Sequence, residues 1–211
     1  MPHGQKLWHA QVITKETNPT LDDLNRTSLL ERFYLAGGTG LALHLGHRRS
    51  RDLDFFTEGP LDADLAIDSL RGLKDLRVID KGEGTLHANI GATKVSFLRY
   101  PYSLLFAHEL FREVKIADPR DIGCMKLSAI ASRGTRRDFI DLYAVARLHG
   151  LSQLVQWFEE KFRQASCSRV HLFKSLTYFE DAEREPMPDM LIPLSWSEVK
   201  TFFSAEVPKL L

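Results

Sequence analysis

Hydrophobic positions before residue 118 recur mostly at the spacing of β-strands. Short apolar runs, bounded by glycine or alternating with polar residues, predict strands at 33–36, 76–79, 85–90, 93–99 and 113–117. The third and fourth of these runs flank Gly91, so we expect them to form a hairpin with one covered face. Positions at helical spacing predict helices at 20–31 and 61–70. This half of the chain is therefore expected to alternate between strands and helices.

From Asp118 onward the pattern is almost wholly helical. Asp118 and Pro119 fit the cap and first turn of a helix that breaks at Gly134. Thr135 then caps a helix over 136–149. Further helical patterns cover 152–164 and 169–179, a linker or surface loop covers 181–193, and a last helix opens at Ser195.

The predicted fold class is α+β. A mixed sheet with flanking helices would be followed by a C-terminal helical bundle. We place the two domains at residues 1–117 and 118–211. Aromatic residues at helical intervals are expected in the bundle core: Trp157, Phe158, Phe162, Phe173, Tyr178 and Phe179.

Composition narrows the function classes. The 211 residues are 44% hydrophobic, enough for a core, and 28 basic residues balance 28 acidic ones, so no global field recruits nucleic acid or membrane. Cys124 and Cys167 are far apart, which argues against a disulfide framework or a zinc site. No apolar run approaches the roughly 20 residues of a membrane span, and no signal core is seen. We expect a cytoplasmic protein with no membrane partner.

The segment from Phe33 to Phe56 carries the first candidate site. A predicted strand ends at Gly37 and Gly38, where a glycine backbone can approach a ligand closely. Thr39 would then lie near the N-terminus of a helix, where unpaired N–H groups and the helix dipole favour a phosphate.

Two acids follow in the next predicted strand. Asp52 and Asp54 share one face of this strand, while Leu53 and Phe55 face the core. Adjacent like charges cost energy unless a cation or hydrogen bonds offset their repulsion. Beside a phosphate-binding turn, the pair therefore predicts Mg²⁺ and a nucleotide. The alternative, an edge strand with two ordinary solvated acids, remains open on these residues alone.

A basic cluster precedes these acids. His47, Arg48, Arg49 and Arg51 could receive a triphosphate or an RNA backbone, and a solvated connection explains them equally well. We expect His44 and His47 at helix-end and surface positions.

A second group of polar residues lies on two predicted helices. Lys126 and Arg133 fall on one side of the first helix, where they could meet phosphates. Asp138 and Asp141, three residues apart, share a face of the second helix. The alternative is a salt-bridged helical hairpin in which Lys126 or Arg133 pairs with Asp138.

Four motifs in order make the chain resemble the AbiEii/AbiGii-type nucleotidyltransferase toxins of the minimal nucleotidyltransferase superfamily. They are Gly37-Gly38-Thr39, Ser50-Arg51-Asp52-Leu53-Asp54-Phe55, Lys126-Leu127-Ser128-Ala129 and Arg137-Asp138-Phe139-Ile140-Asp141-Leu142-Tyr143. The resemblance implies Mg²⁺-dependent transfer of a nucleoside monophosphate from an NTP to an acceptor such as tRNA or a protein. It also implies a toxin with a cognate antitoxin.

The same resemblance assigns roles to residues of this chain. Catalytic roles fall to Asp52, Asp54, Lys126 and Asp138, of which Asp52 and Asp54 would bind Mg²⁺. Nucleotide contacts are expected from Gly37, Gly38, Thr39, Ser50, Lys126 and Arg133. Asp138 would orient Lys126 or the acceptor.

One position departs from the superfamily pattern. Ser96 stands where a third carboxylate is expected on a neighbouring strand, and a hydroxyl is a poor Mg²⁺ ligand and a weak base. Two carboxylates could suffice, or Asp80 or Glu83 could substitute. A third reading is an attenuated pseudoenzyme that binds a nucleotide or a partner. Nucleotidylation of a small molecule is a further option for the acceptor.

Overall fold

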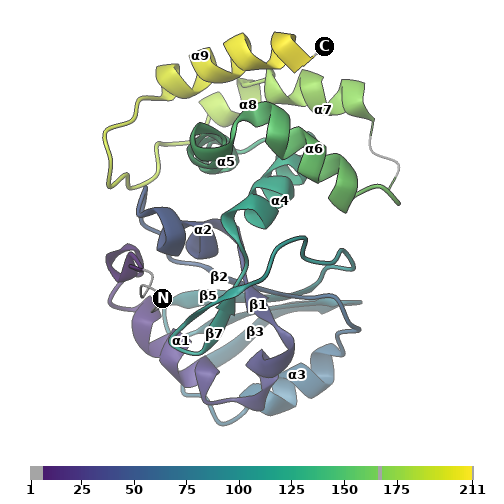
Figure 1. Ribbon diagram of the computed structural model, residues 1–211. Helices are drawn as coiled ribbons and strands as arrows, with labels where there is room; N and C mark the ends of the chain where they lie inside the picture. Colours follow the sequence, from purple (N-terminus) through teal and green to yellow (C-terminus); the bar gives the residue numbers. More distant parts are fainter. Residues whose placement is uncertain (1–6, 166–167, 211) are drawn as a thin grey trace, which may run out of the picture.

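The computed structural model describes residues 7–165 and 168–210, so Cys167 lies outside the described residues. A seven-stranded mixed sheet has helices on both faces, and the C-terminal helices are stacked beyond one of these faces (Figure 1). The α+β fold predicted from the sequence is therefore confirmed. Within the described residues, no helix is long and apolar enough to cross a membrane.

The strands are β1 (Tyr34–Leu35), β2 (Leu53–Thr57), β3 (Leu76–Gly82), β4 (Thr85–Ile90), β5 (Thr93–Arg99), β6 (Glu109–Phe111) and β7 (Val114–Ile116). The α-helices are α1 (Thr17–Asn25), α2 (Gly37–Leu45), α3 (Ala63–Leu70), α4 (Pro119–Ser132), α5 (Arg136–His149), α6 (Leu151–Lys161), α7 (Arg169–Leu176), α8 (Glu180–Glu183) and α9 (Trp196–Glu206). Short 3-10 helices cover Ala10–Val12, Ser28–Arg32 and Val207–Leu210.

The strand order is β3-β4-β5-β2-β1-β7-β6. The central strand β2 pairs antiparallel with β1 and parallel with β5. In this register Asp54 lies opposite Ser96, so the departure noted in the sequence falls on the strand next to the paired acids. The predicted hairpin of β4 and β5 is also present.

The two faces of the sheet have different coverings. On one face Phe55 stacks on Phe97 with ring centroids 5.5 Å apart, in a core shared with α1 and α3. Each such aromatic side chain contributes about 1.5–3 kcal/mol when it is fully buried. The other face, which carries Asp52 and Asp54, is turned toward α2 and α4 (Figure 1).

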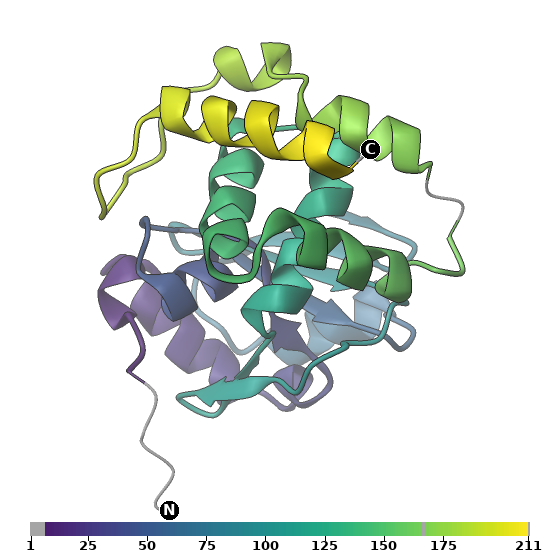
Figure 2. The same cartoon turned by 45° about the horizontal axis from the view of Figure 1, so that its top comes forward.

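The C-terminal helices surround Phe139 of α5, which contacts Phe179, Trp196 and Phe203. Figure 2 shows α9 lying across α5. Five of the six aromatic residues predicted for this core pack in it. Tyr178 is the exception, because it is 51% exposed and its hydroxyl donates to Glu180.

Local chemistry explains which boundaries were predicted well. The carboxylate of Asp118 accepts the N–H of Arg120, and the hydroxyl of Thr135 accepts the N–H of Asp138, as their capping roles require. The division into two domains at residue 118 stays a prediction. Contacts do cross the predicted boundary, since α2 packs on both α4 and α5.

The predicted helix over 20–31 was wrong at both ends. Helix α1 starts at Thr17 and ends at Asn25. The backbone of Thr27 is extended and its hydroxyl donates to the Leu24 carbonyl, a local bond that competes with continuation of the helix. The patterns also missed the short elements β6 and α8, and α8 begins just before the predicted loop over 181–193.

Gly123 allows α4 to lie close to α5 and α6. A Cβ added there would be 2.9 Å from Leu154 Cδ2 and 3.1 Å from Val145 Cγ1. We predict that Gly123→Ala lowers the free energy of unfolding by about 1–3 kcal/mol through overpacking, measured by urea denaturation. Gly72→Ala is the control, since nothing lies within 4 Å of its added Cβ. Equal urea midpoints for Gly123→Ala and Gly72→Ala would contradict the explanation that Gly123 lets α4 pack closely on α5 and α6.

Candidate active site

The glycine turn between β1 and α2 is in close contact with the paired acids. Gly37 has a positive φ of 60°, and a Cβ added there would lie 2.9 Å from Asp54 Oδ2. A Cβ on Gly38 would collide with the guanidinium of Arg48. Both positions therefore need glycine, one for its backbone conformation and both for space.

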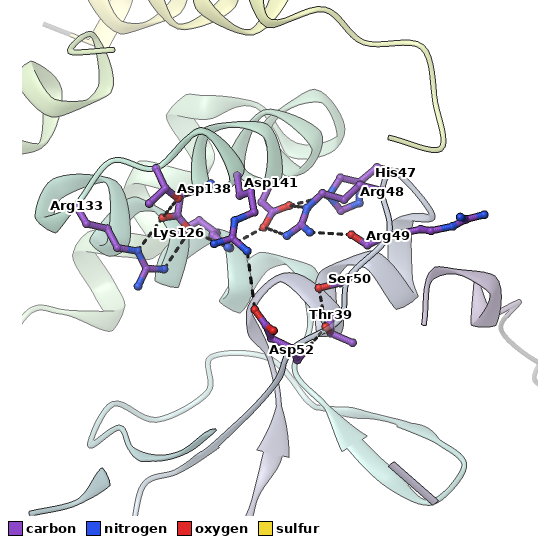
Figure 3. A network of polar contacts seen from close by, with 12 residues as sticks. Thr39, His47, Arg48, Arg49, Ser50, Asp52, Lys126, Arg133, Asp138 and Asp141 are labelled. Carbon is purple, nitrogen blue, oxygen red and sulfur yellow. Dashed lines mark hydrogen bonds and ion pairs between the residues drawn. The ribbon is translucent and has the colours of Figure 1, made fainter. Parts of the chain in front are cut away.

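Thr39 ties the first turn of α2 to the chain that leads into β2. Its hydroxyl lies 2.7 Å from Ser50 Oγ and also contacts the carbonyl oxygen of Asp52 (Figure 3). The side chain is 1% exposed and does not line the cavities described below. Any contact of Thr39 with a phosphate would thus use its backbone N–H, and that role stays a prediction.

Asp52 and Asp54 have different surroundings. Burial, and next the charge of Asp52, raise the pKa of Asp54, and a hydrogen bond from Ser96 opposes this rise. Asp52 is half-exposed and only 3.9 Å from Arg137 Nη1. Among the residues that the structure describes, Asp54 has no ion pair, although Lys94 and Lys126 both favour its ionised form. Asp54 on β2 and Asp52 just before it are thus two carboxylates whose repulsion a divalent cation would relieve.

Two cavities adjoin these acids. One has a volume of about 280 Å³ and the other about 400 Å³. They share five lining residues, Gly38, Asp54, Lys94, Lys126 and Arg133, and so form one cleft between the sheet and α4. The first is lined mainly by charged side chains, and the second also by apolar ones that include Phe56, Leu98 and Met125.

A buried ionic network forms the wall opposite the acids, and Asp141 is its centre (Figure 3). Arg48 donates two hydrogen bonds to this carboxylate, from Nε at 2.7 Å and Nη2 at 2.8 Å. His47 Nε2 donates at 2.8 Å, and Lys126 Nζ lies 2.7 Å from Oδ2. Burial alone would raise the pKa of Asp141, but Arg48 and Lys126 hold it well below its usual range.

Asp138 is the second acid of this wall. It accepts hydrogen bonds from Lys126 at 2.9 Å, Arg133 at 3.0 Å and Thr135 at 2.6 Å. Burial opposes ionisation, yet these partners lower its pKa strongly. The salt-bridged hairpin considered as an alternative is therefore present, and its members also line the cleft.

Most of the predicted site residues come together. The first cavity is lined by Gly38, Ser50, Asp52, Asp54, Lys126, Arg133 and Asp138, and Gly37 lines the second. Sequence reasoning did not assign Lys94 or Arg137 to the site, and it named Arg48 only within a basic cluster that could receive a triphosphate. The sequence could have indicated Lys94, because this residue alternates with the core residues of β5 and so shares a face of the strand with Ser96.

The expected surface exposure of two histidines was wrong. His44 does lie at the end of a helix, in the last turn of α2, but His44 and His47 are only 7% and 2% exposed. His44 Nε2 lies 2.9 Å from the Ala117 carbonyl oxygen, and His47 bonds to Asp141. Arg48 is buried and bonds to the same carboxylate, so the segment between α2 and β2 is not simply a solvated connection.

The residues present fit one Mg²⁺ whose remaining ligands come from substrate. Among the residues that the structure describes, no group of three or more His, Cys, Asp or Glu side chains could hold a metal. Mg²⁺ at nucleotide sites uses one or two carboxylates together with phosphates and water. Asp52 and Asp54 can provide the two carboxylates. Asp80 is on β3, opposite His87 of β4. It is exposed and lies about 14 Å from β2 by strand spacing.

Comparison with known proteins identifies the family of the chain. The model of the nucleotidyl transferase AbiEii toxin family, of type IV toxin–antitoxin systems, matches residues 20–110 and 97–209. The chain belongs to this family. It is 38% identical over 205 residues to the uncharacterized protein aq_aa25 of Aquifex aeolicus (strain VF5), covering 94% of this chain and 98% of the relative.

A solved structure supports the fold of this AbiEii family member. MenT4, a nucleotidyltransferase toxin of Mycobacterium tuberculosis H37Rv, is similar with a TM-score of 0.58 at 16% sequence identity. The match covers 93% of this chain and 85% of MenT4. At this identity the likeness shows a shared nucleotidyltransferase fold.

Removing the charge of Asp141 should destabilise the protein. Asp141→Asn keeps the size of the side chain but leaves Arg48 and Lys126 buried with less opposite charge. We predict a loss of about 3–5 kcal/mol in the free energy of unfolding, measured by denaturation at pH 7. Asp68→Asn, in an exposed pair with Arg71, should change it by less than about 0.5 kcal/mol. A loss below about 1 kcal/mol in Asp141→Asn would contradict the role of the network.

The same acids predict how stability changes with pH. The pKa values of Asp138 and Asp141 are lower in the folded protein than the roughly 3.9 of an unfolded chain. The folded state thus binds fewer protons in acid, so their contribution is full above about pH 4 and is lost as pH falls below it. Asp141→Asn should flatten this acid decline, and an unchanged slope in denaturation from pH 5 to 2 would contradict the assignment.

Proposed function

We propose that this family member transfers a nucleoside monophosphate from an NTP to a hydroxyl of an RNA acceptor such as tRNA, with Mg²⁺ bound by Asp52 and Asp54. The observation that carries the proposal is the cleft itself. Asp54 of β2 and Asp52 just before it line a cavity of about 280 Å³ together with Lys126, beside a glycine turn at a helix N-terminus.

Each part of the cleft has a role in this reaction. When bound, Mg²⁺ offsets negative charge on the phosphates and helps to align them for in-line displacement. The turn at Gly37 and Gly38 brings backbone N–H groups toward the phosphates. Lys126 uses two of its three N–H groups on Asp138 and Asp141, which leaves one for a phosphate oxygen.

The charged rim favours a polyanionic acceptor over a neutral one. The side chains of Arg133 and Arg137 are 65% and 56% exposed and both line the first cavity, as does the exposed Lys94. Exposed cations at a cleft attract phosphates along a nucleic-acid chain. A protein acceptor is the alternative outcome of the experiment below.

We also propose a biological setting. As a member of a type IV toxin family, the protein acts with a cognate antitoxin. Because both proposed substrates, an NTP and an RNA, occur in the cytoplasm, we propose that the protein acts there.

Loss of one proposed metal ligand should abolish transfer. Incubated with α-³²P-labelled NTPs, Mg²⁺, total tRNA and cell protein, the wild type should label RNA. Asp54→Asn should lower the rate about 10³-fold, equivalent to about 4 kcal/mol of transition-state stabilisation. Asp68→Asn, on the distant helix α3, should match the wild type. Labelling of the protein fraction alone would mean that the acceptor is a protein and not RNA. No labelling of either fraction would contradict the proposed transferase activity.

A further inference from the structure

A row of three polar side chains crosses the sheet at the cleft. In the strand register Asp54 of β2 lies opposite Ser96 of β5, which lies opposite His87 of β4. All three line the cavity of about 400 Å³. With neighbouring strands about 4.8 Å apart, His87 lies about 10 Å from Asp54 along this row. Ser96 fills the space between them in the sheet, so a phosphoryl group and an attacking hydroxyl would lie in the cavity that all three side chains line.

Hydrogen bonding along this row determines which nitrogen of His87 carries the proton. The Ser96 hydroxyl bonds to the Asp54 carboxylate, which when ionised can only accept, so Ser96 must donate its one proton there. Ser96 Oγ lies 3.1 Å from His87 Nδ1 and can then only accept from it. The imidazole therefore carries its proton on Nδ1, and Nε2 presents a lone pair.

The other bases of the cleft are already engaged. Asp138 accepts bonds from Lys126, Arg133 and Thr135, and its low pKa makes it a poor proton acceptor. Asp52 and Asp54 are the proposed metal ligands. Within residues 7–165 and 168–210, no hydrogen bond or ion pair is found for His87 Nε2. His87 is thus the base in the cleft that has an available lone pair.

We propose that His87 is the general base of the transferase, and that Ser96 positions it. This proposal rests on the proposed function. The acceptor oxygen forms a bond to the α-phosphorus of the NTP as the bond from that phosphorus to the β-phosphate oxygen breaks, and pyrophosphate leaves. The hydroxyl proton passes to His87 Nε2 and then to solvent. Ser96 therefore belongs to the base arrangement, and an acid at this position is unnecessary.

His87→Asn tests this role without removing the hydrogen bond to Ser96, because the asparagine amide nitrogen can take the place of Nδ1 and donate to Ser96 but cannot take up a proton at neutral pH. The rate of transfer at saturating NTP should fall about 10²–10⁴-fold, the usual contribution of a general base. The dissociation constant for NTP, measured by calorimetry, and the melting temperature should change little. His108→Ala, at an exposed position outside both cavities, is the matched control and should keep the wild-type rate.

Chemical rescue separates catalysis from structure. In His87→Ala, added imidazole should restore transfer several-fold, and it should have no such effect on Asp54→Asn. A wild-type rate in His87→Asn, or an impaired rate in His87→Ala that imidazole leaves unchanged, would overturn the role of His87 while leaving the proposed function intact. An inactive wild type would overturn the proposed function and, with it, this inference.

Discussion

The cleft depends on the buried carboxylate of Asp141. It joins Arg48, in the connection after α2, to Lys126 of α4, and it is itself part of α5. Each charge buried in this way costs several kcal/mol to desolvate. The network therefore contributes less to net stability than to fixing the positions of its side chains. The network joins the connection after α2 to α4 and α5, with Arg48 and Asp141 93 residues apart, and it holds Lys126 at the cavity that Asp54 also lines.

Other features of the cleft follow from this constraint. Gly38 must lack a side chain because the guanidinium of Arg48 occupies that space. The connection is also held from outside, since Leu191 N donates to the His47 carbonyl at 2.9 Å and Arg49 N to the Asp189 carbonyl at 2.8 Å. The C-terminal segment thus supports the residues that hold Asp141.

Features decided by local chemistry could be predicted from the sequence. The caps at Asp118 and Thr135 depend on residues two or three positions away, and the shared face of Asp52 and Asp54 follows from strand alternation. The pairing of Arg48 with Asp141 spans 93 residues. A basic run such as 47–49 has no local feature that distinguishes burial on an acid from exposure to solvent. The hydrogen bond of His87 to Ser96 likewise requires the register of two strands.

In the proposed mechanism, the carboxylates of Asp52 and Asp54 and the ammonium of Lys126 act together on one Mg²⁺–NTP. A crystal structure with Mn²⁺ and a non-hydrolysable NTP analogue tests this most directly, because Mn²⁺ accepts the same oxygen ligands and can be located by its anomalous scattering. We expect Mn²⁺ bound to both Asp52 and Asp54, with the triphosphate between the turn at Gly38 and Lys126. A nucleotide bound elsewhere, or Mn²⁺ away from both acids, would contradict the account.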